Sequence, residues 1–123
     1  MTGIDQDRAL PIDPDDAFQA VSNSRRRQVL LSLAQSDGPL SASELAREIA
    51  AIENLVDPSE VTSEQRTRVY ISLIQSHLET LDDLGVAEYD ERGKRVMATE
   101  ATKPVARHIR EISRSCYEPE EAK

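Results

Sequence analysis

The amino-acid sequence predicts a mainly α-helical domain with one small β-hairpin. Its 123 residues are enough for a single hydrophobic core. Hydrophobic residues make up 38% of the chain, but only one Phe and three Tyr are aromatic. The core must therefore consist of Leu, Ile, Val and Ala, which favours helices over a β-sandwich. Helix-capping residues also recur along the chain, and the helix-like hydrophobic period gives way to a strand-like one near its C-terminal third.

Capping sequences predict four helices before the hairpin. They begin at Asp13-Pro14, Ser22-Asn23-Ser24, Ser41-Ala42-Ser43-Glu44 and Thr62-Ser63-Glu64-Gln65. Asp, Asn, Ser and Thr accept hydrogen bonds from the first free backbone N–H groups of a helix, and Pro suits its first position. The last two segments have the form of a capping box. The fourth helix is the longest and ends at Gly85, and the polar segment Asn54 to Val61 before it is a loop.

Two strand-like runs and a last helix follow. Val86–Tyr89 and Arg95–Ala98 flank a polar turn, in which Gly93 is expected to supply a positive φ. A final helix spans Thr102–Ser115. The folded domain is therefore placed at residues 13–116, between a flexible acidic tail at 1–12 and a second acidic tail at 117–123.

The composition disfavours several functional classes. No apolar run could cross a membrane and the N-terminus does not have the pattern of a signal peptide, so we expect a cytoplasmic protein. Cys116 is the only cysteine and the two histidines stand apart, so neither a metal nor another cofactor is expected. Phosphate-binding and nucleophile motifs are missing from the sequence, which predicts a protein that is not an enzyme; no small-molecule effector is identifiable.

Charge is segregated along the chain. The formal net charge of −8 argues against a nucleic-acid partner. However, residues 36–64 hold seven acids and one basic residue, whereas residues 92–114 hold seven basic residues and two acids. The segment between Gln65 and His77 contains no acid. An acidic protein can therefore still present basic surface to a polyanion.

The predicted order of elements is the layout of a winged helix-turn-helix, whose last helix before the hairpin enters the DNA major groove. Three segments resemble ArsR-like regulators: Asn23–Leu30, Ser43–Ala46, and the recognition-helix segment Ser72–Val86. The long loop from Asn54 to Val61 departs from their compact turn. That loop and Arg68–Leu73 resemble instead a family of small haloarchaeal winged-helix proteins of mostly unassigned function (DUF7344-like), over residues 14–112. The resemblance implies a halophilic archaeal protein, whose KCl-rich cytoplasm would explain the acidity.

The fourth helix is the predicted recognition helix. Helical spacing predicts a core face made of Ile71, Ile74, Leu78, Leu81 and Gly85. The opposite side is polar and basic, and such side chains can hydrogen-bond base edges, although it could also be a merely solvated face. The predicted DNA contacts are Arg66, Arg68, Tyr70, Ser72, Gln75 and Ser76 on this helix and Arg92, Lys94 and Arg95 on the hairpin. For the hairpin residues, simple solvation of the loop is the alternative.

Two further sets of residues have alternative interpretations. Arg25, Arg26 and Arg27 begin the second helix, where the helix dipole disfavours cations, so we expect them to contact phosphate or to pair with Asp15 and Asp16. The apolar stripe of the final helix either packs on the first helix or pairs with a second copy. Since similar regulators dimerise through their first and last helices, the resemblance implies a dimer interface of Phe18, Val21, Val105, Ile109, Ile112 and Cys116.

The predicted function is that of a transcriptional regulator that binds double-stranded DNA sequence-specifically as a homodimer. The alternative is a winged-helix adaptor that binds another protein and no DNA, since a fold does not imply a function. An adaptor should expose apolar residues around Ser72 and Gln75, where the sequence offers only Tyr70 and Leu73.

Overall fold

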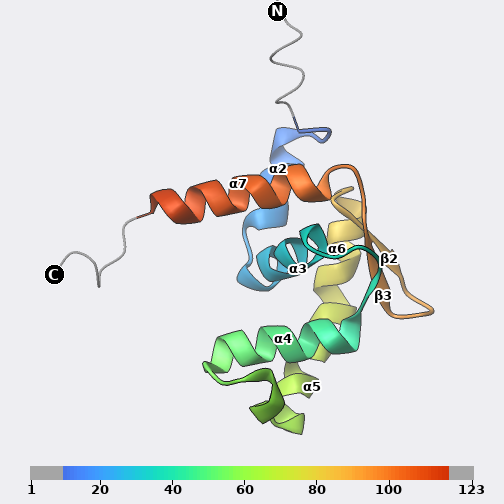
Figure 1. Ribbon diagram of the computed structural model, residues 1–123. Coiled ribbons are helices and arrows are strands. Elements are labelled where there is room, and N and C mark those ends of the chain that lie inside the picture. The colour runs from blue at the N-terminus through green and yellow to red at the C-terminus, as the bar shows by residue number, and fades with distance from the viewer. Residues whose placement is uncertain (1–9, 117–123) are drawn as a thin grey trace, which may run out of the picture.

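The computed structural model describes residues 10–116 and confirms a mainly helical fold with a small antiparallel sheet (Figure 1). The helices are α2 (Pro14–Val21), α3 (Ser24–Ala34), α4 (Ala42–Asn54), α5 (Ser63–Ser72), α6 (Leu78–Asp83) and α7 (Thr102–Ser115). A 3-10 turn, η1 (Pro58–Glu60), precedes α5, and a π-helical segment, η2 (Leu73–His77), joins α5 to α6. The strands are β1 (Leu40–Ser41), β2 (Ala87–Asp90) and β3 (Arg95–Ala98). Helix α3 lies between α7 and α4, with the hairpin beside them.

The predicted helix starts are confirmed. The side chains of Asp13, Asn23 and Ser41 accept hydrogen bonds from the first backbone N–H groups of α2, α3 and α4. Thr62 and Gln65 form a complete capping box at the start of α5. Leu10 and Ile12, which the prediction assigns to the N-terminal tail, pack against the core. Predicted tail residues 1–9 and 117–123 lie outside the described residues.

The sheet contains one strand more than the sequence predicted. Its order is β1-β3-β2, with both pairs antiparallel. Strand β1 pairs Leu40 with Val96 and Ser41 with Arg95. Two residues carry too little pattern to indicate a strand, so this pairing arises from the tertiary contact alone. It fixes the hairpin against the start of α4.

The core face of the long helix differs from the prediction. The fully buried positions are Val69, Leu73, Leu78 and Leu81, whereas Ile71 is 43% exposed. The cause is η2, in which the N–H of Leu78 bonds to the carbonyl of Leu73, five residues back. This extra residue rotates everything before it by one position relative to Leu78. A regular period extrapolated backwards from Leu78 reaches Ile74 and then Ile71, whereas the structure turns the preceding residues, Leu73 and Tyr70, towards the core.

The hairpin turn is also built differently from the prediction. Lys94, with a φ of 54°, adopts the left-handed conformation that was assigned to Gly93. A Cβ at Gly93 would lie 2.6 Å from Oδ2 of Asp90, so a larger residue there would displace that carboxylate. Over the part of the chain that is described, no helix is long and apolar enough to cross a membrane.

Candidate nucleic-acid interface

The start of α4 contacts two separate parts of the sequence that carry basic residues, α5 and the hairpin. Ser41 pairs with Arg95 across the sheet, and the N–H of Ala42 donates to the carbonyl of Lys94 at 2.9 Å. The next residue, Ser43, accepts a hydrogen bond from the guanidinium of Arg66 on α5. The side chain of Arg66 and the backbone of the hairpin at Lys94 and Arg95 therefore both contact the first residues of α4, a helix N-terminus whose dipole favours anions.

A small hollow opens beside this junction. It has a volume of about 250 Å³ and is lined by Ser43, Arg66, Thr67 and Tyr70. Hydroxyl and guanidinium groups of this kind make most contacts to DNA phosphates. The DNA contacts predicted from the sequence do not include Ser43 and Thr67. Ser43 is interpreted there only as part of a helix-capping sequence, and Thr67 is an exposed residue with no distinctive sequence pattern around it.

The remaining residues predicted on the recognition helix fall into two groups. Arg68, Gln75 and Ser76 are exposed, so they could meet base edges directly. Arg66, Tyr70 and Ser72 are half-buried, and Tyr70 packs against the core. On the hairpin, Arg92 and Arg95 are exposed, whereas Lys94 is half-buried. The structure thus separates a half-buried set beside α4 from an exposed set along α5, η2 and the hairpin.

Acidic side chains limit this surface. Arg68 pairs with Glu64 at 3.1 Å, with both side chains about three-quarters exposed. An exposed i,i+4 pair contributes at most about 0.5 kcal/mol, so a phosphate could displace Glu64. Asp90 lies opposite Arg95 in the hairpin.

The three consecutive arginines of α3 have intramolecular partners, but not the predicted Asp15 and Asp16. Arg25 forms two hydrogen bonds with Glu53 of α4, at 2.7 and 2.8 Å, which raise its pKa. Arg26 donates to the carbonyls of Gln19 and Ala20, and Arg27 donates to that of Val21. The last two arginines therefore bind the carbonyl end of α2, which carries partial negative charge.

Arg26 also connects this helix end to η2. Its guanidinium lies 3.3 Å from Nδ1 of His77, the last residue of η2. An arginine only donates, so Nδ1 must accept, and His77 is held neutral. Burial lowers the pKa of His77, and the charges of Arg26 and Arg25 lower it further.

We expect the domain to lose stability in mild acid because of His77. Since its pKa is lower in the folded state than in the unfolded chain, the unfolded chain binds the proton more readily. The contribution of neutral His77 to the free energy of unfolding is complete above the ordinary histidine pKa of 6.5. It is lost as the pH falls towards and through the lowered pKa of the folded state. Chemical denaturation between about pH 7 and 5 should show this loss, and His77→Gln should remove much of it. An unchanged pH profile in His77→Gln would contradict the assignment.

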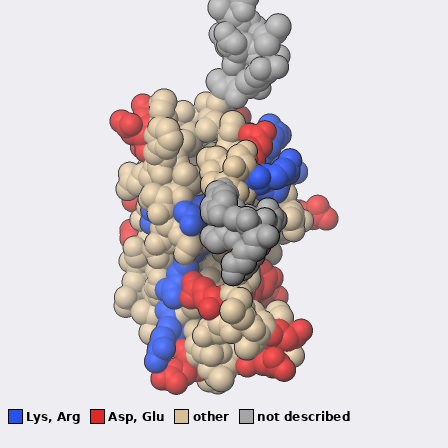
Figure 2. All heavy atoms as spheres, turned by 90° about the vertical axis from the view of Figure 1, so that its left-hand side faces the viewer, with Lys and Arg blue, Asp and Glu red and all other residues tan. Residues whose placement is uncertain are grey.

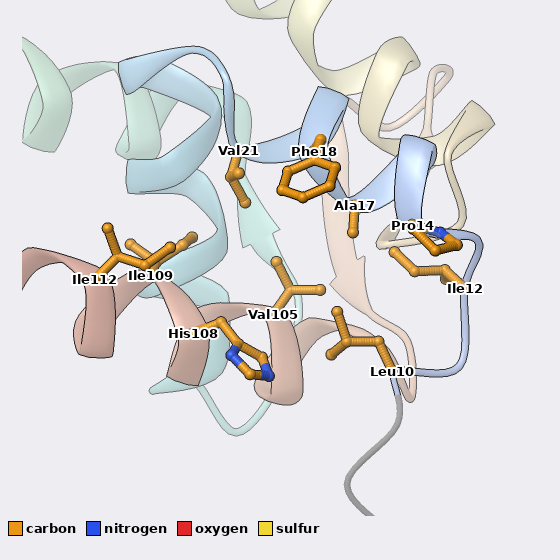
Figure 3. A pocket seen from close by; sticks show the side chains of 10 residues that line it. All are labelled: Leu10, Ile12, Pro14, Ala17, Phe18, Val21, Val105, His108, Ile109 and Ile112. Atoms are coloured by element: carbon orange, nitrogen blue, oxygen red, sulfur yellow. The ribbon is translucent and has the colours of Figure 1, made fainter. Parts of the chain in front are cut away.

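A second feature is an apolar groove between α2 and α7. It has a volume of about 510 Å³, and Figure 3 shows the side chains from both helices that line it. Five of the predicted dimer residues line this groove: Phe18, Val21, Val105, Ile109 and Ile112. The sixth, Cys116, lines an adjoining hollow together with Val21, Ile109 and Ile112. Val105 and Ile109 are buried within the chain, where α7 packs mainly on α3. By contrast, Phe18 and Ile112 are 72% and 59% exposed.

The stripe on α7 therefore divides into two halves. Its first half is intramolecular core, but its partner is α3 and not the predicted first helix. Its second half continues as exposed apolar surface along the groove. Within residues 10–116, no cluster of three or more His, Cys, Asp or Glu side chains could hold a metal ion.

The geometry defines a small helical domain with a hairpin fixed to a helix N-terminus. Comparison with known families assigns it further: a family described as a domain of unknown function (DUF7344) matches residues 18–97. The chain belongs to this family. No curated protein and no solved structure matches the chain.

Proposed function

We propose that this protein is a winged helix-turn-helix regulator that binds double-stranded DNA sequence-specifically as a homodimer. The observation that carries the proposal is the junction at the start of α4, where Ser43 accepts from Arg66 and the backbone of Lys94 and Arg95 lies alongside. Phosphates would bind at this junction and its hollow. The exposed side chains of Arg68, Gln75 and Ser76 would then read base edges, since Arg suits guanine and Gln suits adenine.

The acidic residues indicate how DNA would lie. Asp57, Glu60 and Glu64 are exposed just before or at the start of α5. The segment from Asp57 to Glu64 would therefore stay outside the contact, whereas α5 from Arg66 onwards and η2 would face the DNA. The likeness to ArsR-like and haloarchaeal winged-helix proteins supports this arrangement and a halophilic origin. In molar salt little counterion-release energy remains, so base contacts and shape would have to supply the specificity.

Selection of bound fragments from random duplex DNA, in a series of KCl concentrations, tests the proposal. The purified protein should enrich one sequence. We expect Gln75→Ala to relax base preference at one position, with a loss of about 1–3 kcal/mol on the selected site. Lys94→Ala should weaken binding about equally on all sequences, because a phosphate contact carries no sequence information.

Arg114→Ala is the matched control, since it removes a positive charge from exposed surface on α7. It should bind like the unaltered protein. Failure of the folded protein to enrich any sequence would overturn the proposed function. Equal losses for Gln75→Ala on selected and random DNA would overturn only the role of Gln75.

The homodimer is proposed to form across the groove between α2 and α7. A two-fold interface must be complementary to itself, and this face offers both a hollow and exposed apolar side chains to fill it, Phe18 and Ile112. Dimerisation would place two recognition helices about one DNA turn apart.

Replacing Phe18 and Ile112 together with Ser should convert a dimer into a monomer. Both side chains are mostly exposed, so the fold should survive, whereas an interface loses most of its affinity when central apolar residues are removed. Sedimentation equilibrium measures the change, and Ile71→Ser, an exposed apolar residue on α5, is the control. A monomeric unaltered protein would refute this interface.

A further inference from the structure

The leucine at the C-terminal end of α4, Leu55, has both an unfavourable backbone conformation and an exposed side chain. The N–H of Val56 bonds to the carbonyl of Ala51 at 3.0 Å and the N–H of Leu55 to that of Ile52 at 3.3 Å, the bonding of a Schellman helix end. In this motif Leu55 takes the left-handed conformation, with a φ of 55° and a ψ of 45°. Glycine normally occupies this position, because a Cβ is strained there. In addition, Leu55 is 92% exposed, so its side chain contributes almost nothing to the core.

Leu55 belongs to an apolar groove. The groove has a volume of about 500 Å³ and is lined by Glu48, Ala51, Ile52, Leu55, Val56 and Pro58. Ile52, one turn before Leu55, is 53% exposed. An exposed apolar groove that includes a residue with a strained backbone is typical of a surface that becomes buried when a binding partner is present.

Acidic residues border the groove. Glu48 lines it, and Asp57 and Glu60 are exposed on the segment that closes it. Residues 36–64 as a whole hold seven acids and one basic residue, Arg47. Figure 2 shows this end of α4 in its lower part, where uncharged surface has acidic atoms on both sides. The complementary surface is apolar in its centre and basic at its edges.

We propose that this groove binds an amphipathic helix of another protein, with an apolar stripe over Ile52 and Leu55 and Lys or Arg side chains beside the acids. Helix-in-groove recognition uses such anchors at helical spacing. A second copy of the chain fits less well here, because a two-fold contact would bring the acidic border of this groove against the same acidic border of the other copy. The groove lies at the opposite end of α4 from the Arg66 junction, about 20 Å along the helix, so the two surfaces can act together.

Binding of a synthetic helical peptide, with Leu along one face and Lys elsewhere, tests the proposal by fluorescence anisotropy. We expect Leu55→Gly to weaken binding about tenfold or more, as for an anchor at the centre of an interface. The same substitution should raise the melting temperature, since glycine relieves the left-handed strain. Lost binding therefore cannot be attributed to unfolding.

Three comparisons complete the test. Met97→Ser removes exposed apolar surface on β3, away from both proposed interfaces, and should leave peptide binding unchanged. A peptide with Glu in place of Lys should not bind. Equal binding by Leu55→Gly and the unaltered protein, or equal binding of both peptides, would overturn the proposal. Self-association that Leu55→Gly abolishes would also overturn it, since the occupant would then be a second copy.

Discussion

Replacing Leu73 with Ala is expected to lower the free energy of unfolding by about 2–5 kcal/mol, which is a large part of the stability of a domain of this size. Leu73 is fully buried at the start of η2. Removal of its side chain loses the transfer energy of the buried methyl and methylene groups and leaves a cavity that the rigid helices around it cannot fill. Urea denaturation, followed by circular dichroism, measures the change.

Ile71→Ala is the matched control on the same helix. Ile71 is 43% exposed, so its replacement should cost far less, within about 1 kcal/mol. The sequence-based period predicts the reverse order, with Ile71 in the core. A larger loss for Ile71→Ala than for Leu73→Ala would show that the helix runs without the π-helical turn.

Single-residue deletions should have opposite effects in α4 and in η2. Arg47 is exposed in the middle of α4, between the buried pairs Leu45–Ala46 and Ile49–Ala50. Its deletion rotates the second pair by about 100° relative to the first, so both cannot stay buried. We expect this deletion to abolish cooperative thermal unfolding.

Deletion of Gln75, which is also exposed, should leave the domain folded. The steps between Val69, Leu73, Leu78 and Leu81 are four, five and three residues, and the deletion makes them four, four and three. That is the period of a regular α-helix, so the same side chains remain buried. The helix content should stay native, while the base preference proposed for Gln75 is lost. Unfolding of this variant would show that the core depends on the π-helical turn itself.

The parts of the fold that could be predicted from sequence are those set by neighbouring residues. Asp13, Asn23, Ser41 and Thr62 cap helices because the N–H groups that they bind lie two or three residues away. The hairpin strands followed from the change in hydrophobic period. The candidate site was predicted only as residue types: Arg68 and Gln75 are exposed as expected, whereas Tyr70 packs against the core.

The sequence by itself determined the mainly helical class, the helix starts, the hairpin and the segregation of charge, because short-range hydrogen bonding and hydrophobic period encode them. The tertiary structure decided which face of the long helix is buried, since one π-helical turn moves Leu73 inward and Ile71 outward. It also directed Arg25 to Glu53 and the other two arginines to the end of α2. Finally, it brought Arg66 and Lys94 to the start of α4. These contacts join residues far apart in the chain, and their energies depend on packing geometry that no local pattern carries.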